Sequence, residues 1–320
     1  MINIIKLISL NKVEQKAFIY VFFVSILFLL SLIQANVLYV DDMYRVLSGY
    51  VYWNNDVRPL STLIFKIIEL GEPLTDISPL PQILSIALYS VSSIYLGKIF
   101  KVDNLIFLSL GGIAFVLSPF NLANFSFVFD SFTMGLAVFT STTAFLITSI
   151  VLEQKLSYYR KIIIFFLILF LLVSSLCFYQ GATSIYLAIL TFYSLLNFIK
   201  DTNIQKSIYL FTTPLIILFI SVIIYLPLKD LFVNPYASRR SQTPPFKDIL
   251  NVFINNLFGL VKTVNSLLGN GNLSSFFYLL LILMMTTSIL LFFYSFFKKE
   301  MSNIINFMSI INRVSSSKMV

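Results

Sequence analysis

Long apolar stretches separated by short polar segments dominate this chain of 320 residues. A helix needs about 20 mostly apolar residues to cross the hydrocarbon core of a bilayer. Eight windows reach or approach that length, at approximately 17–38, 80–97, 104–120, 131–152, 162–178, 182–199, 207–228 and 275–297. The pattern predicts an all-α polytopic membrane protein with about eight transmembrane helices.

The segments between these windows differ greatly in length. Most are short, but 39–79 and 229–274 each run for about 40 residues, and long loops often carry function. Within the first, the stretch from Ser61 to Leu70 is apolar yet too short to span, which predicts a re-entrant or interfacial helix. We expect one membrane-embedded domain over 1–300 and a cytoplasmic tail over 301–320.

Composition supports the membrane class, because 58% of the residues are hydrophobic and only 11% are charged. The formal charge of +8 follows the alternation of the loops. Loops on the side of the amino terminus hold 14 of the 22 basic and 5 of the 14 acidic residues, for a net charge of +9, and the other side nets −1. This asymmetry predicts cytoplasmic termini in a bacterial inner membrane, and it leaves no basic surface for nucleic acid.

The residue inventory excludes several chemistries. The chain has one cysteine and no histidine, so disulfides, Cys/His metal sites and catalysis through histidine are unavailable. It contains no phosphate-binding loop, dinucleotide fingerprint or metalloprotease helix. We therefore expect no cofactor and no metal.

Polar chemistry begins where the first apolar window ends. Asp41 and Asp42 are adjacent carboxylates, and Arg45 follows at helical spacing. A carboxylate at a membrane surface can act as a general base toward a sugar hydroxyl, and an arginine can hold a phosphate. The alternative is a solvated helix end carrying an ordinary ion pair.

Aromatic and basic residues follow directly. Tyr50, Tyr52 and Trp53 offer flat rings for stacking on a sugar, and Arg58 adds a second cation before Pro59. The alternative for the tyrosines is the aromatic belt of any membrane protein. Trp53, as the only tryptophan, is the stronger candidate.

Four later residues come to the same side by topology. Asp130 opens the fourth window, where it either serves the site or caps a helix, and Gln180 lies in a tight turn. Arg239 and Arg240 are adjacent in the second long loop, as phosphate ligands or as a solvated pair.

The residues that carry a family resemblance are YVDDMYRVLSGYVYWNNDVRPLS from Tyr39 to Ser61 and GEPLTDISPLPQILSIAL from Gly71 to Leu88. With FVFDSFTMGLAVF around Asp130 and CFYQGATSIYLAI around Gln180, they resemble the serotype-converting O-antigen glucosyltransferases, the glucosyltransferase type II membrane family, over roughly 20–300. The resemblance implies a GT-C-like fold. It also implies catalytic roles for Asp41 and Asp42, and substrate or phosphate binding by Arg45, Trp53, Arg58, Asp76, Asp130, Gln180, Arg239 and Arg240.

The resemblance further implies the reaction and its partners. Glucose would pass from undecaprenyl-phosphate glucose to an O-antigen repeat unit of lipopolysaccharide on the periplasmic face. A bactoprenol glucosyltransferase and a flippase would supply the donor. The alternatives are a lipid-linked sugar flippase or transporter, which should carry charges near the middle of its helices, and an O-antigen polymerase.

Overall fold

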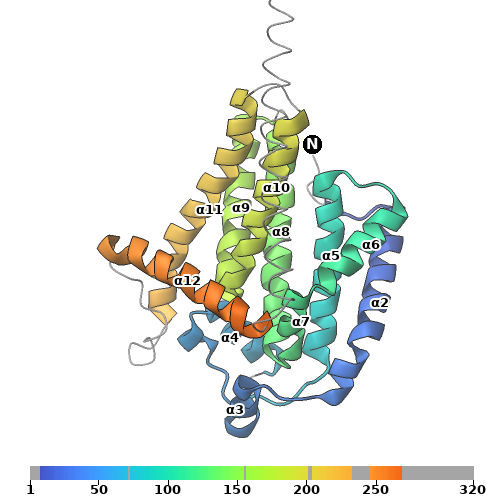
Figure 1. Cartoon of the computed structure of the whole chain (residues 1–320), viewed down its shortest axis with the longest axis vertical. Helices are drawn as coiled ribbons and strands as arrows, with labels where there is room; N and C mark the ends of the chain where they lie inside the picture. Colours follow the sequence, from blue (N-terminus) through green and yellow to red (C-terminus); the bar gives the residue numbers. More distant parts are fainter. Residues whose placement is uncertain (1–7, 71–72, 155, 201–203, 233–245, 269–320) are drawn as a thin grey trace, which may run out of the picture. The chain divides into compact units, whose positions relative to one another are not determined.

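The computed structural model describes residues 8–70, 73–154, 156–200, 204–232 and 246–268. These residues form helices joined by turns and contain no strand, which confirms the predicted all-α class (Figure 1). The described residues up to Ser194 and from Ile208 to Phe232 belong to one compact unit, called the bundle below. The segment 246–268 belongs to a second unit and is described separately.

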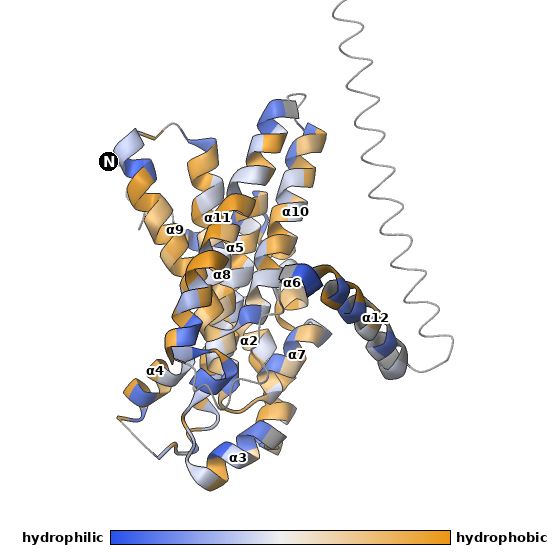
Figure 2. Cartoon of the chain, turned by 90° about the vertical axis from the view of Figure 1, so that its left-hand side faces the viewer, coloured by the Kyte–Doolittle hydropathy of each residue, from blue (hydrophilic) through white to orange (hydrophobic). Residues whose placement is uncertain are grey.

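Six described helices are long and apolar enough to cross a membrane. They are α2 (Lys12–Ala35), α5 (Leu80–Phe100), α8 (Asp130–Glu153), α9 (Tyr158–Phe178), α10 (Thr183–Lys200) and α11 (Ile204–Phe232). Hydrophilic residues gather toward the ends of these helices and apolar residues fill their middles (Figure 2). The chain is therefore a membrane protein, as the hydropathy pattern predicts.

The third expected span, 104–120, is not one straight helix. α6 (Leu105–Val116) and α7 (Pro119–Ser126) meet at an angle of 57°. Pro119 opens α7, and a proline at this position cannot continue the preceding helix because it lacks an N–H group. With this pair counted as one span the described helices give seven, so the expected eight are not confirmed, and the last predicted span, 275–297, lies outside the described residues.

α8 packs between α5 and α9 and carries much of the core (Figure 1). Small residues permit its close approach to α5. A Cβ atom on Gly135 would lie 2.8 Å from the hydroxyl of Ser85, and that hydroxyl donates to the carbonyl of Ser131 at 2.7 Å. Packing of small residues with hydrogen bonds between helices is how membrane bundles associate, since burial of apolar surface alone gains little in lipid.

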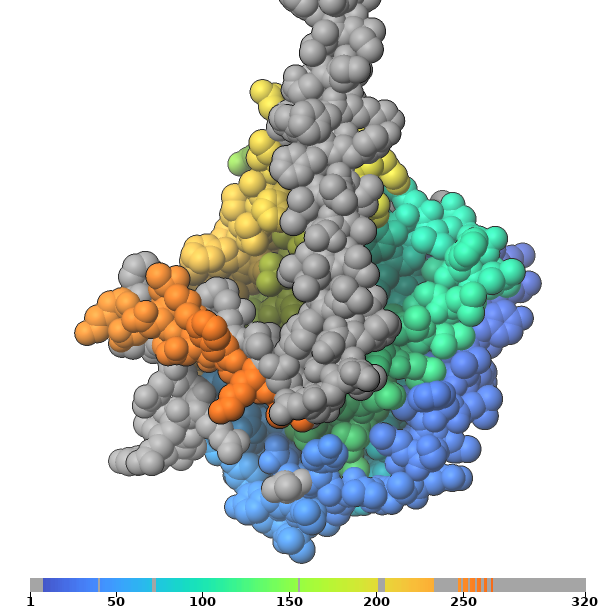
Figure 3. All heavy atoms as spheres, in the orientation of Figure 1, coloured from blue at the N-terminus to red at the C-terminus, as the bar shows by residue number. Residues whose placement is uncertain are grey.

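Three short elements connect α2 to α5 at one end of the bundle: α3 (Val40–Ser48), the 3-10 turn η1 (Trp53–Asp56) and α4 (Pro59–Ile68). We call this the α3 end, and it appears at the bottom of Figure 3. α3 stops at Gly49, which has a φ of +63° and lies so close to Pro73 that a Cβ atom would approach its Cβ to 2.4 Å. α4 matches the short apolar helix expected over Ser61 to Leu70.

The second long loop is more ordered than the sequence pattern suggests. After η4 (Phe246–Asp248), residues Ile249–Leu268 form the 20-residue helix α12. Its apolar residues recur at helical spacing among asparagines, so no continuous apolar run marks it as a helix in a search for spans.

Candidate functional site

Asp42 is a fully buried carboxylate that ties α3 to the start of α8. Its Oδ2 atom accepts from the backbone N–H of Val128 at 3.0 Å, and its Oδ1 atom accepts from that of Phe129 at 3.4 Å. Oδ2 also accepts from the N–H of Tyr39 at 3.4 Å, where α3 begins. Burial raises the pKa of Asp42, and these backbone bonds oppose that rise.

Arg45 leaves α3 on the same side as Asp42 and is also buried, with 4% of its side chain exposed. Its guanidinium carbon lies 3.8 Å from the ring centroid of Trp53, a cation–π contact. One nitrogen, Nη2, lies 3.7 Å from Asp56 and 3.9 Å from Asp130. The other two, Nε and Nη1, have no hydrogen-bond partner among the described residues, which is unusual for a buried guanidinium.

Asp130, the first residue of α8, is the carboxylate that both arginines approach. Asp42, Arg45, Trp53, Asp56, Arg58 and Asp130 are called the charged group below. Trp53 Nε1 donates to its Oδ1 atom, and Arg58 Nη1 lies 3.7 Å from its Oδ2 atom. The guanidinium of Arg58 also lies 4.8 Å from the ring centroid of Tyr179. A carboxylate in the first turn of a helix also interacts favourably with the helix dipole.

Asp56 is the member of the group that the sequence analysis did not single out. It lies within ion-pair distance of Arg45, and its side chain is 41% exposed, so it faces the open side of the group. Burial raises its pKa, the two arginines lower it, and Asp130 and Asp41 raise it. Its position two residues before the Arg-Pro pair was the available signal.

Asp56 therefore gives a pH-dependent expectation for stability. A carboxyl group whose folded-state pKa is raised above 3.8 contributes stability below that pH and loses it as pH rises through the folded pKa. Asp56→Asn should unfold at a higher temperature than wild type at pH 7 and show no such gain below pH 3.8. Thermal unfolding in detergent at both pH values measures this, and a lower unfolding temperature at pH 7 contradicts it.

Gln180 holds the backbone of the turn that carries Asp56 and Arg58. Its Nε2 atom donates to the carbonyl of Val57 at 2.8 Å, and the Tyr225 hydroxyl of α11 donates to the same carbonyl at 2.8 Å. Val57 has a φ of +58°, a left-handed conformation that costs a β-branched residue roughly 1–2 kcal/mol. Strain of this kind persists only where surrounding contacts impose it.

We expect Tyr225→Phe to lower activity by about 10-fold, because one of two bonds that fix the turn is lost. Val57→Gly should recover most of that loss in the double variant, since glycine adopts a positive φ freely. Initial rates of the reaction in membranes of equal protein content measure both. Tyr186→Phe is the matched control, because it removes a buried hydroxyl that lies 3.4 Å from the carbonyl of Pro214, in the helical core.

The remaining predicted residues do not join this group. Asp41 lies on the exposed side of α3, and its negative charge helps to raise the pKa of Asp56. Asp76 is exposed and accepts from the N–H of Ser78 at 2.8 Å, a local turn contact. Arg239 and Arg240 lie outside the described residues.

An apolar cavity of about 450 Å³ is lined in part by chain neighbours of Asp56 and Arg58. It lies between α4, α9 and α11, and Leu63, Phe170, Val173, Leu228 and Phe232 contribute most of its apolar lining. Asn54 and Pro59, which flank Asp56 and Arg58 in the chain, also line it. Residues of the turn that carries Asp56 and Arg58 therefore form part of the cavity wall.

The fold and the charged group together define a membrane protein with a polar site at the ends of apolar helices. The family described as Glucosyl transferase GtrII matches residues 30–312, and the chain belongs to that family. This confirms the resemblance inferred from the Asp41–Asp42 region, and the family's description names a glucosyl transferase.

The chain is 30% identical over 195 residues to the "Uncharacterized 55.3 kDa protein in gtrB 5'region" of Salmonella phage P22. That alignment covers 60% of this chain and 38% of the phage protein. No solved structure matches the chain.

Proposed function

We propose that the chain transfers glucose from undecaprenyl-phosphate glucose to an O-antigen repeat unit on the periplasmic face of the bacterial inner membrane. Both termini would then be cytoplasmic, and the α3 end would face the periplasm. A bactoprenol glucosyltransferase and a flippase would deliver the donor. The modified repeat unit would change the serotype of the cell.

The observation that carries this proposal is the pair of arginines, Arg45 and Arg58, together with an apolar cavity that Asn54 and Pro59 of the same turn help to line. Arg45 keeps Nε and Nη1 without partners while buried, and Arg58 keeps Nε without one, among the described residues. Donors of this kind suit a phosphate, whose negative charge grows as the glycosidic bond breaks. The cavity between α4, α9 and α11 suits part of the isoprenoid chain attached to that phosphate.

The chemistry requires one bond to form and one to break. The acceptor hydroxyl oxygen attacks the anomeric carbon of the donor glucose, and the bond from that carbon to the phosphate oxygen breaks. The lipid phosphate leaves with the electron pair, held by Arg45 and Arg58. Asp41 takes the proton of the acceptor hydroxyl, and Asp42 holds α3 in place through its backbone bonds.

Expression in a smooth-lipopolysaccharide host that makes and flips undecaprenyl-phosphate glucose tests the proposal. Mass spectrometry of the O-antigen should show a gain of one hexose per repeat unit. The same host without the donor synthase should show none, which identifies the donor. An unchanged repeat unit across a panel of acceptor serotypes, with the protein present in the membrane, overturns the proposal.

A further inference from the structure

α3 buries two charged residues and exposes large apolar ones. Asp42 and Arg45 face the bundle, whereas Met43, Tyr44 and Leu47 are 46%, 61% and 86% exposed, on the same helix as the exposed Asp41 and Ser48. A surface helix of a soluble domain shows the opposite arrangement. The outward face of α3 therefore presents large apolar and aromatic side chains to its surroundings.

Three tyrosines on and after α3 form a row of touching rings. The centroids of Tyr44 and Tyr50 lie 5.6 Å apart with an interplanar angle of 66°, and those of Tyr50 and Tyr52 lie 5.3 Å apart at 59°. The middle ring of the row lies near the charged group, since the Arg45 guanidinium carbon lies 6.0 Å from the centroid of the Tyr50 ring. At one end of the row, Lys66 Nζ lies 4.9 Å from the centroid of the Tyr52 ring.

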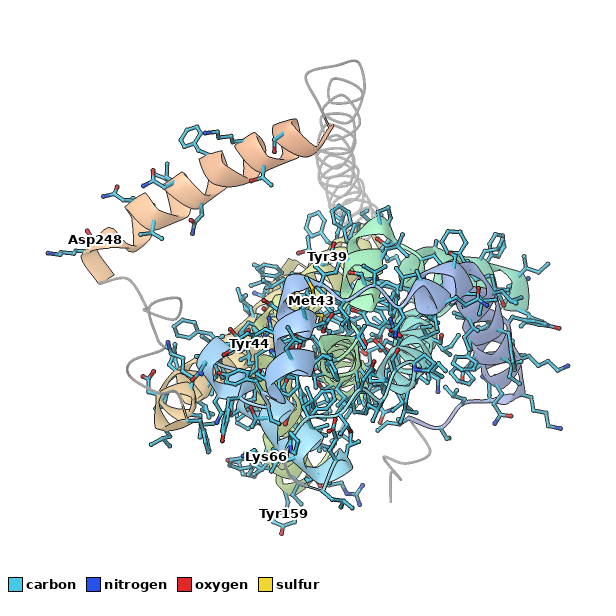
Figure 4. All side chains as sticks on the ribbon, turned by 90° about the horizontal axis from the view of Figure 1, so that it is seen from below. Tyr39, Met43, Tyr44, Lys66, Tyr159 and Asp248 are labelled. Atoms are coloured by element: carbon cyan, nitrogen blue, oxygen red, sulfur yellow. The ribbon has the colours of Figure 1, made fainter. Side chains whose placement is uncertain are left out.

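The position of the row distinguishes it from an aromatic belt. A belt surrounds a bundle where its sides meet the lipid headgroups. α3 instead crosses the end of the bundle, and Tyr39, Met43 and Tyr44 lie on it in the view onto that end (Figure 4). Figure 1 places α3 beyond the ends of α5 and α8. Tyr44 therefore lies at the end of the bundle and not along its sides.

We propose that Tyr44, Tyr50 and Tyr52 form a binding platform for the carbohydrate chain of the acceptor. An aromatic face is electron-rich and attracts the C–H groups of a sugar ring, while a tyrosine hydroxyl can exchange hydrogen bonds with sugar hydroxyls. Tyr50, the middle ring of the platform, lies near Arg45, so a chain bound across the platform passes close to the charged group. This inference rests on the proposed function for the identity of the acceptor.

The platform replaces Trp53 as the sugar-stacking element. Trp53 is fully buried, with its ring stacked on Phe65 at 4.6 Å and covered by Arg45. No sugar can reach either face of that ring. As the only tryptophan, however, it reports by fluorescence on what binds beside Arg45.

The test measures binding without the donor. Lipid-free O-polysaccharide from the host strain is titrated into the full chain in detergent, and Trp53 fluorescence is followed. Tyr44→Ala and Tyr52→Ala should each raise the Kd for polysaccharide by roughly 2- to 12-fold, the value of one good aromatic contact. In transfer assays both should raise the KM for the acceptor and leave the KM for the donor unchanged.

Two sets of variants make the result specific. Tyr158→Ala and Tyr159→Ala remove rings that are 81% and 73% exposed at the start of α9, away from the α3 end, and should leave polysaccharide binding unchanged. Tyr44→Leu keeps apolar surface for a membrane and removes the ring. It should bind polysaccharide as weakly as Tyr44→Ala, and wild-type binding by Tyr44→Leu overturns the platform in favour of a membrane contact.

The outcomes separate the platform from the reaction. Tyrosine-dependent binding of polysaccharide without hexose transfer supports the platform and counts against the proposed function. Hexose transfer with an unchanged acceptor KM in Tyr44→Ala and Tyr52→Ala overturns the platform and leaves the function standing. Equal polysaccharide binding by wild type and both alanine variants also overturns the platform.

Discussion

Asp41→Asn lowers hexose transfer by roughly 10²–10⁴-fold, the usual cost of losing a general base, and leaves the amount of folded protein unchanged. The expectation follows because α3 places Asp41 and Asp42 in different surroundings. Asp41 is exposed and helps to raise the pKa of Asp56, whereas both oxygens of Asp42 accept from backbone N–H groups. The measurement is the initial rate of hexose transfer in membranes matched for protein content.

Asp42→Asn should mainly lower the stability of the protein, and its loss of activity should follow from the loss of folded protein. An amide there offers one oxygen in place of two, so the N–H of Phe129 meets a donor, at a cost of about 1–3 kcal/mol. Asp103→Asn, an exposed carboxylate between α5 and α6, is the matched control and should behave as wild type. Wild-type transfer by Asp41→Asn, with a large loss in Asp56→Asn, would move the base to Asp56.

Hydropathy predicted the spanning helices well because apolar length is a local property of the chain. The windows at 80–97, 131–152 and 207–228 fall within α5, α8 and α11. Hydropathy did not predict the bend that a single proline causes, nor a helix whose apolar residues form no continuous run. Pro119 breaks the third window at a bend that no average over 17 residues can show, and α12 alternates apolar residues with asparagines.

The sequence predicts several residues that the fold brings together, but it does not predict which of them are buried. The group does contain Asp42, Arg45, Trp53, Arg58 and Asp130 together. Burial decides the roles, and burial depends on how α3 turns about its axis and how η1 folds under it. Neither can be read from spacing, so the sequence predicts sugar stacking by Trp53, which is fully buried, and does not single out Asp56.

Asp130→Asn is expected to lower the free energy of unfolding by about 3 kcal/mol, because removing one partner from a buried ion pair leaves the other charge uncompensated. The carboxylate is only 4% exposed and lies within 4 Å of nitrogen atoms of both Arg45 and Arg58. An asparagine keeps an oxygen for Trp53 Nε1, so the loss isolates the charge. Chemical denaturation in detergent, followed by Trp53 fluorescence, measures it.

The matched control is Glu153→Gln in the pair with Lys101, which has an N–O distance of 2.9 Å and side chains that are 40% and 66% exposed. Its shorter distance would predict the larger loss if distance governed stability. Exposed pairs contribute at most about 1 kcal/mol, since water screens them. A loss in Glu153→Gln equal to that in Asp130→Asn would mean that burial does not set the strength of the charged group. The case for Arg45 and Arg58 as phosphate ligands would then lose its electrostatic basis, because a solvated arginine gains little from an anion.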